Sequence, residues 1–185
     1  MIAEIQKEAS NKMSYAVDHA REDLATIRTG RAHPAMFNKI QADYYGAPTP
    51  LQQLATFTST DPRSMMITPF DRSAIGAIEK AIREADLGVN PSNDGNAVRI
   101  VMPQLTEERR KEYIKMAKAK AEDARIAVRN VRRHSHDQLK KLQKDGEISE
   151  DDLSRAEKAL DASTKKFVES IDEILKHKEA ELNEI

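Results

Sequence analysis

The segment from Leu105 to Leu142 restricts the possible folds most, because it carries one long periodic pattern and contains neither Gly nor Pro. Small and apolar residues recur along it mostly in steps of three and four, the spacing of one face of an α-helix. This face, called the seam below, consists of Ile114, Ala117, Ala121, Ala124, Val128, Val131, Ser135 and Leu142. Thr106 fits an N-cap, Glu107 and Glu108 place negative charge in the first turn, and Asp145-Gly146 ends the helix.

A cationic stripe runs beside the seam, also at helical spacing. It consists of Lys111, Lys115, Lys118, Arg125, Arg129 and Arg132, and at about 1.5 Å per residue it extends over roughly 30 Å. Residues 106–145 include thirteen Lys or Arg and seven Asp or Glu, whereas residues 149–185 include six and eleven. The basic charge is therefore segregated in a chain whose net charge is only −1. The alternative is a plain solvated face. A rigid cationic edge of this length nevertheless favours binding to the phosphate backbone of a large nucleic acid.

Two further helices have matching apolar faces. The first is predicted over Ile2–Thr29, with Gly30 as its C-terminal stop, and the second begins at Ser149, which forms a capping box with Asp152. Their inward residues are Met13, Val17, Ala20, Leu24 and Ile27 in the first, and Leu153, Ala156, Leu160, Phe167, Ile171, Ile174 and Leu182 in the second. None of the three helices could bury its stripe alone, so we expect an elongated three-helix bundle.

The middle of the chain is rich in Pro and Gly and contains short strand-like runs. We expect these runs at Phe37–Tyr44, Leu51–Thr58, Met65–Thr68 and Ala97–Met102. One helix interrupts them. It is capped by Asp71, lined by Ile75, Ile78 and Ile82, and followed by Gly88, and Asn93-Asp94-Gly95 forms a turn before the last strand.

These patterns predict an α+β protein with a discontinuous domain. Residues 1–30 and 105–185 form the bundle, and residues 31–104 form a compact domain inserted between its first two helices. The chain then crosses between the domains twice, near Gly30-Arg31 and near Pro103-Gln104-Leu105. Two short crossings predict a hinge, with a rigid double crossing as the alternative.

Composition excludes several functional classes. The chain of 185 residues has no Cys, which excludes disulfides, thiolate metal sites and a Cys nucleophile. No apolar run approaches the ~20 residues that span a membrane, and the first residues lack the apolar core of a signal peptide. We therefore expect a soluble cytosolic protein without membrane contact.

Catalytic and metal-binding patterns are also missing. No glycine-rich phosphate loop occurs, so the chain should not hydrolyse GTP itself. His134 and His136 stand two apart and point to different faces of a helix, which favours surface histidines over metal ligands. Tyr44-Tyr45 could stack on bases, although packing at a strand edge is the favoured interpretation. We predict no enzyme activity, no metal and no cofactor.

Several motifs, in order and over essentially the whole chain, resemble the bacterial ribosome recycling factor family. They are Arg28-Thr29-Gly30-Arg31-Ala32, Tyr44-Tyr45-Gly46 with Thr49-Pro50-Leu51, Asp86-Leu87-Gly88 with Asn90-Pro91, Leu105-Thr106-Glu107-Glu108-Arg109-Arg110, and Val128-Arg129-Asn130-Val131-Arg132-Arg133. The resemblance implies an L-shaped protein made of a three-helix bundle and a smaller, swinging β/α/β domain. It also implies a monomer that binds the post-termination 70S ribosome and the 50S subunit and, with elongation factor G and GTP, splits the ribosome.

The resemblance also implies roles for individual residues. Arg129, Arg132 and Arg133 match the family's basic motif and are the leading candidates for contacts with large-subunit ribosomal RNA. Arg110 matches the start of the same helix, and Arg28 matches the end of the first helix. Arg125, on the cationic stripe of the basic helix, is a further candidate. Gly30, Arg31, Pro103, Gln104 and Leu105 match the hinge.

Two segments depart from the family pattern. His134-Ser135-His136-Asp137 stands where an acidic and then small polar residues are more usual, and Ser59-Thr60-Asp61-Pro62 replaces a Val-Pro-Glu run. Other functions remain open on the residues alone. A coiled-coil scaffold for a partner helix and a general RNA-binding chaperone are the main alternatives, and a hydrolase is a distant third because no nucleophile or metal cluster is visible.

Overall fold

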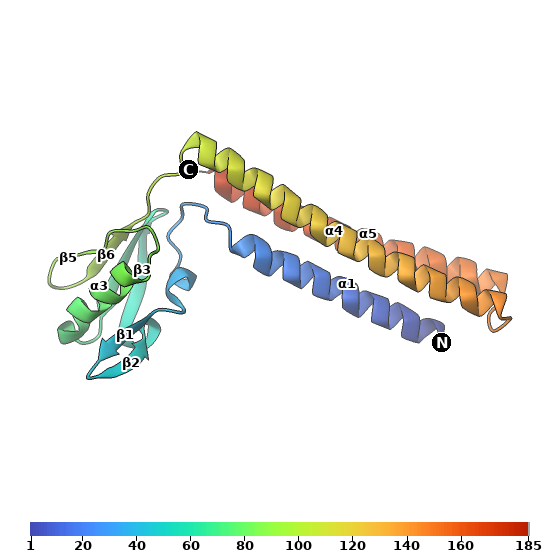
Figure 1. The fold of residues 1–185 in the computed structure, drawn as a ribbon, viewed down its shortest axis with the longest axis horizontal. Coiled ribbons are helices and arrows are strands. Elements are labelled where there is room, and N and C mark those ends of the chain that lie inside the picture. Colours follow the sequence, from blue (N-terminus) through green and yellow to red (C-terminus); the bar gives the residue numbers. More distant parts are fainter. Residues whose placement is uncertain (185) are drawn as a thin grey trace. The chain divides into compact units, whose positions relative to one another are not determined.

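The computed structural model describes residues 1–184. By its internal contacts the chain divides into two units, drawn in Figure 1. One contains Met1–Arg28 and Glu107–Glu184, and the other contains Thr29–Thr106. The expected α+β class is confirmed, since long helices form the first unit and all the strands of residues 1–184 lie in the second.

Three helices form the first unit: α1 (Ile2–Ala25), α4 (Glu107–Lys144) and α5 (Glu150–Asn183). α4 and α5 run side by side in opposite directions, joined by a short turn, and α1 packs against both (Figure 1). Their apolar faces meet in one buried cluster of mostly small and aliphatic side chains. The cluster contains Ala9, Met13, Val17, Ala20, Ala121, Ala124, Val128, Leu139, Ala156, Leu160 and Ile171. The predicted three-helix bundle is confirmed.

The buried face differs from the predicted one at two positions. Leu139 is fully buried and belongs to the seam of α4, where the prediction passed directly from Ser135 to Leu142. Thr164 of α5 is also buried, and its hydroxyl donates to the Leu160 carbonyl at 2.8 Å. Because the hydroxyl is satisfied within its own helix, the threonine can occupy a core position that its polarity argues against.

α1 ends earlier than the sequence indicates. The prediction ran to Thr29, but the helix stops at Ala25. The Thr26 hydroxyl donates to the Asp23 carbonyl at 2.6 Å, and the N–H of Ile27 donates to the Leu24 carbonyl at 3.2 Å. These bonds tighten the last turn and close the helix. Gly30, with φ +77°, therefore lies in the linker beyond the helix.

The turn between α4 and α5 follows the predicted signals. Gly146 has φ +77° and its N–H donates to the Gln143 carbonyl at 3.0 Å, while the N–H of Glu147 donates to the Leu142 carbonyl at 2.9 Å. This is the Schellman pattern of helix termination. The predicted capping box is confirmed, because the Ser149 hydroxyl accepts from the N–H of Asp152 and the Asp152 carboxylate accepts from the N–H of Ser149.

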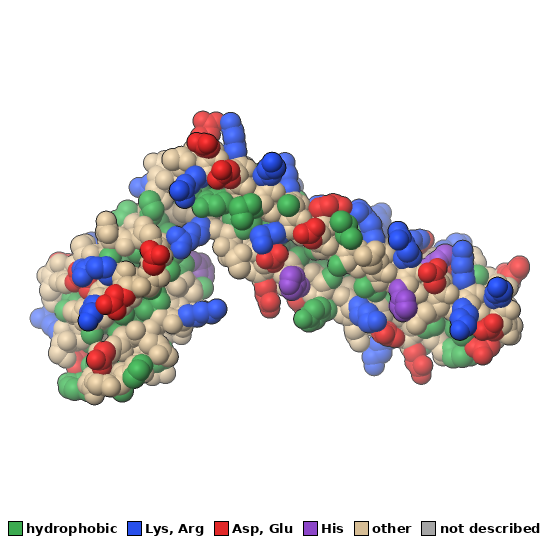
Figure 2. Space-filling model, in the orientation of Figure 1, with side chains coloured by type: hydrophobic (Ala, Val, Ile, Leu, Met, Phe, Trp, Pro, Cys, Tyr) green, Lys and Arg blue, Asp and Glu red, His purple; other side chains and the backbone are tan. Residues whose placement is uncertain are grey.

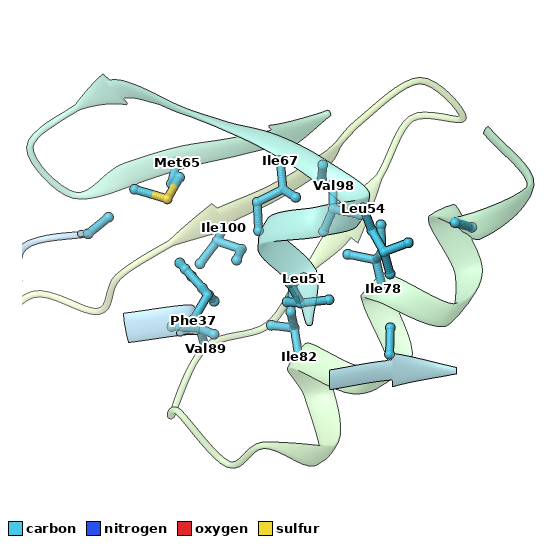
Figure 3. Close-up of a cluster of buried hydrophobic side chains, with 14 of the residues drawn as sticks. Phe37, Leu51, Leu54, Met65, Ile67, Ile78, Ile82, Val89, Val98 and Ile100 are labelled. Carbon is cyan, nitrogen blue, oxygen red and sulfur yellow. The ribbon is translucent and has the colours of Figure 1, made fainter. Parts of the chain in front are cut away.

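The second unit holds two small antiparallel sheets and two α-helices. β1 (Gln41–Tyr44) pairs with β2 (Ala47–Pro50), and β3 (Ala55–Asp61), β4 (Ser64–Pro69), β6 (Val98–Val101) and β5 (Ser92–Asn93) form the second sheet in that order. α3 (Ile75–Glu84) and a short helix, α2 (Leu51–Leu54), cover the core. Two 3-10 turns, Pro34–Phe37 and Arg72–Ala74, complete the unit. Figure 3 shows Phe37, Leu51, Ile67, Ile78, Ile82 and Ile100 converging in this core.

One strand prediction in this unit begins too early, and one strand was not predicted. Leu51–Leu54 forms α2 instead of the start of a strand, and its Leu side chains fill the core. Ala47–Pro50 is a strand despite two prolines, because it lies at the edge of a two-stranded sheet where a missing N–H costs little. The predicted helix is confirmed: Asp71 caps the turn that leads into it, by accepting from the N–H of Ser73 at 2.9 Å.

Both segments that lead out of the second unit are anchored to the same turn between β3 and β4. The N–H of Ala32 donates to the Pro62 carbonyl at 2.9 Å, and the N–H of Met102 donates to the Arg63 carbonyl at 2.7 Å. Asp61 stiffens that turn by accepting from the N–H of Arg63 at 2.9 Å. The Ser59–Pro62 departure from the family pattern thus covers the end of β3 and the first residue of the turn that holds both crossings.

Candidate nucleic-acid interface

α4 carries most of the cationic candidates, and the structure separates them into different environments. Figure 2 shows Lys and Arg side chains along the bundle interspersed with Asp and Glu. The stripe is therefore no continuous row of free cations. Which cations remain available depends on the side chains that the neighbouring helix presents to each of them.

We call three of the side-chain pairs between α4 and α5 the α4–α5 ladder. Arg125 contacts Asp172 at 2.6 Å, the Arg132 Nε donates to Asp161 Oδ1 at 2.6 Å, and His136 Nε2 lies 2.9 Å from Glu157 Oε1. Going along α4 the partners run backward along α5, as they must between antiparallel helices. Two residues of the predicted cationic stripe, Arg125 and Arg132, are therefore paired with carboxylates of α5.

Arg125 is the most enclosed cation of the stripe. Its side chain is 18% exposed, and it bonds both Asp172 on α5 and Glu122 on its own helix. Burial alone would lower the pKa of the Arg125 guanidinium, but the hydrogen bonds to Asp172 and Glu122 outweigh that effect and raise the pKa. With all three of its nitrogens engaged by carboxylates, Arg125 is a structural residue of the α4–α5 interface.

Arg132 of the cationic stripe is only partly open to solvent. Its side chain is 40% exposed and bonded to Asp161. The physical reason is the angular position of Arg132 on α4. It stands two turns from Arg125 and close to Val128 of the seam, so its stem lies along the contact with α5. The guanidinium remains partly accessible at the edge of that contact.

Arg129 and Arg133 lie on the more exposed side of α4. Arg129 is 54% exposed and shares Glu122 with Arg125, at 3.2 Å. Arg133 is exposed and has no ion-pair partner within residues 1–184. Lys115 and Lys118 are exposed as well, and Lys111 pairs with Glu107 at 3.4 Å on the surface. The cations most open to a ligand are therefore Arg129, Arg133 and these lysines.

The two flanking candidates differ in burial. Arg110 is half-buried and stands seven residues before Ala117, so it continues the line of the seam into the first turn of α4. Arg28 is exposed and lies just beyond the end of α1. The candidate hinge residues Gly30, Arg31, Pro103, Gln104 and Leu105 all belong to the second unit as the contacts divide the chain.

Sequence reasoning missed the acidic partners Glu122, Asp161 and Asp172. A usable signal existed, because a short turn between two long helices fixes their antiparallel register and places Arg132 opposite Asp161. It also missed His136 as a ladder residue. His134 instead lines a groove of about 230 Å³ between α1 and α4, together with Glu8, Lys12 and Gln138. No cluster of His, Asp or Glu within residues 1–184 is arranged to hold a metal ion.

The tyrosine pair of the second unit has two distinct environments. Tyr44 is half-buried, and its hydroxyl donates to Asp71 at 2.7 Å, which raises the pKa of Tyr44 to about 12 and lowers that of Asp71. Tyr45 packs edge-on against Tyr44 but is 84% exposed, with φ +51°. The expected packing role holds for Tyr44 and is wrong for Tyr45, because the tight turn at Tyr45-Gly46 projects that ring outward.

No helix within residues 1–184 has the length and apolarity to cross a bilayer.

Comparison with known proteins gives one consistent result. The ribosome recycling factor family model matches residues 20–182. The ribosome-recycling factor of Cutibacterium acnes is 65% identical over 184 residues and that of Streptomyces coelicolor 61% over 185 residues, with 100% of each chain covered. A solution structure of a ribosome recycling factor matches with a TM-score of 0.77 at 37% identity, covering 100% of this chain and 98% of that one. The T. thermophilus ribosome recycling factor, bound with E. coli elongation factor G to the E. coli post-termination complex, matches with a TM-score of 0.66 at 43% identity over 98% of both chains.

Proposed function

We propose, since the chain belongs to the ribosome recycling factor family, that it binds the post-termination ribosome and separates the subunits together with elongation factor G and GTP. It is a non-enzymatic translation factor of the bacterial cytoplasm, and the GTP is hydrolysed by its partner. It acts as a monomer. The observation that carries the proposal is the full-length similarity to a factor placed with elongation factor G on the post-termination complex.

The bundle would bind large-subunit ribosomal RNA through the exposed side of α4. Arg129 and Arg133 are the best placed contacts because their charges face outward, and Arg132 joins them from the edge of the α4–α5 ladder. Arg28 and Arg110 would extend the contact at the other end of the bundle. Arg125 supports the surface from within and does not itself bind, since its nitrogens are taken by carboxylates.

The second unit would move relative to the bundle during splitting. Its two connections, near Gly30-Arg31 and Pro103–Leu105, are short and carry no helix or strand. Gly30 has φ +77°, a conformation that other residues adopt at a cost. We therefore assign the hinge to Gly30, Arg31, Pro103, Gln104 and Leu105.

Cosedimentation with ribosomes tests the binding half of this proposal. The wild-type protein should pellet with 70S ribosomes and 50S subunits, and its affinity should fall steeply as salt rises, because phosphate contacts release counterions. It should not bind short unstructured RNA comparably. Equal binding to both would indicate a general RNA-binding chaperone, and salt-independent binding would indicate a scaffold that recognises a partner helix.

A further inference from the structure

We propose that Asp161 is a positioning residue that orients Arg132 towards ribosomal RNA. The inference rests on the ribosome binding proposed above. The two arginines of the α4–α5 ladder differ in how many of their nitrogens are bonded. Arg125 is bonded through Nε and both terminal nitrogens, by Asp172 and Glu122. Arg132 is bonded to Asp161 through Nε, at 2.6 Å.

The difference decides what each guanidinium can still bind. An arginine head has five N–H donors in a planar fork, and its two terminal nitrogens match the spacing of two phosphate oxygens. In Arg132 the inner nitrogen is occupied, and no hydrogen bond from the terminal nitrogens to another residue of 1–184 is present. Asp161 thus fixes the plane of the guanidinium while its outer edge stays available.

Exposure agrees with this division of roles. The Arg132 side chain is 40% exposed and that of Asp161 is 55% exposed, so the pair lies at the surface, where a phosphate can approach without any change in the bundle. A flexible arginine on an open surface loses rotamer freedom when it binds. The Asp161 contact removes part of that loss before binding, which strengthens the phosphate contact.

Positioning of Arg132 by Asp161 and simple electrostatics predict opposite effects on RNA affinity. Asp161 is negative and lies beside a surface that should bind RNA, so removal of its charge alone should raise RNA affinity. If Asp161 positions Arg132, Asp161→Ala should instead weaken binding to 50S subunits about fivefold, the equivalent of about 1 kcal/mol. Asp161→Asn keeps an oxygen that accepts from Nε and should bind at least as well as wild type.

The experiment compares equilibrium binding of full-length variants to 50S subunits at two salt concentrations. Glu169→Ala is the matched control, because Glu169 is an exposed acid of α5 outside the ladder. It should bind as well as wild type or slightly better, and all variants should keep the wild-type melting temperature within a few degrees. In an Arg132→Ala background, Asp161→Ala should have no further effect.

Several results would overturn the inference. If Asp161→Ala bound as tightly as wild type, or more tightly, Asp161 would be a bystander or a competitor of RNA. If Asp161→Asn bound as weakly as Asp161→Ala, the hydrogen bond to Nε would not be what positions Arg132. If Arg132→Ala bound normally, there would be no contact for Asp161 to position. Failure of the wild-type protein itself to bind 50S subunits would instead reject the proposed function.

Discussion

Arg125 and Arg133 lie on the same helix, yet their side chains have different surroundings. Arg125 is held between Asp172 and Glu122, whereas Arg133 is exposed and has no ion-pair partner in the part of the chain that the structure describes. A basic motif read from sequence treats such residues alike. In the folded bundle one guanidinium stabilises the contact between two helices, and the other is open to a ligand.

Substitution of the two arginines should separate stability from binding. Arg133→Ala should change the free energy of unfolding by no more than about 0.5 kcal/mol, weaken binding to 50S subunits, and reduce the salt slope by about one phosphate contact. Arg125→Ala should lower stability by about 1 kcal/mol, because it removes two ion pairs and a packed side-chain stem. Urea unfolding and cosedimentation measure the two effects. Normal binding by Arg133→Ala would remove it from the interface.

Tyr44 gives the second unit a distinctive pH dependence. The hydrogen bond to Asp71 raises the pKa of Tyr44 to about 12, so the folded state keeps this proton after the unfolded state has lost it. That stabilisation is present below pH ~10, the usual tyrosine pKa, and is lost as the pH rises towards the folded value. Ultraviolet titration should show one tyrosine ionising late, and Tyr44→Phe should abolish that step. A late step that persists in the variant would belong to another tyrosine.

The same hydrogen bond affects acid stability in the opposite direction. It lowers the pKa of Asp71, together with the bonds from Ser73. Because the folded state releases this proton more readily, the contribution is present above the usual aspartate pKa and is lost as the pH falls through the lowered value. In Tyr44→Phe the melting temperature of the second unit should therefore fall at neutral pH and approach that of wild type at strongly acidic pH. An unchanged difference at both pH values would separate Tyr44 from Asp71.

The helices of the bundle could be predicted from the sequence because their signals are local and repeated. The seam of α4, the Gly146 stop and the Ser149 capping box each depend on residues a few positions apart. Arg132 illustrates what the pattern of one helix, taken alone, could not predict. Its partner Asp161 lies on another helix, and the pairing depends on the register between the helices, which the period of one helix does not contain. The same holds for Asp172 and Glu157.

The sequence patterns failed for secondary-structure elements whose environment overrides their local preference. α2 is a single turn that its Leu residues hold in the core, and β2 contains two prolines at a sheet edge. The early end of α1 is closed by bonds of the Thr26 hydroxyl and the Ile27 N–H. In each case a tertiary or side-chain contact decided between conformations that the sequence pattern left close in energy.

Two glycines in different elements should respond oppositely to the same substitution. Gly146 has φ +77° at the C-terminus of α4, so Gly146→Ala should destabilise the protein by about 1 kcal/mol although space for a methyl group exists. Gly76 lies in α3 with an ordinary backbone conformation and open space around it, so Gly76→Ala should stabilise it by about 0.5 kcal/mol. Thermal unfolding of the pair measures this. A loss of stability in Gly76→Ala would mean that the methyl group meets an unexpected neighbour.

Both crossings are tied to one turn of the second unit. Ala32 and Met102 donate to the adjacent carbonyls of Pro62 and Arg63. The backbone that remains free to rotate is therefore confined to the residues outside those two anchors. This arrangement is consistent with the proposed hinge at Gly30-Arg31 and Pro103–Leu105, and it makes a link between the two crossings feasible.

A disulfide across the hinge should uncouple binding from splitting. One new cysteine is placed within residues 30–32 and one within 103–105, and no native Cys competes for pairing. The oxidised protein, verified by mass spectrometry, should bind 50S subunits about as well as wild type but lose most subunit splitting, because the joint can no longer rotate. Reduction should restore activity, and each single-cysteine variant is the control. Full activity in the oxidised form would mean that splitting needs no rotation at the hinge.

Light scattering of post-termination 70S complexes is the most direct test of the proposed function. With wild-type protein, elongation factor G and GTP, the scattering should fall as 70S particles separate into subunits. It should stay constant when any one of the three is omitted, and Arg129→Ala/Arg133→Ala should need a higher protein concentration for the same rate. Equal splitting without elongation factor G, or none with any compatible elongation factor G, would contradict a role in ribosome recycling.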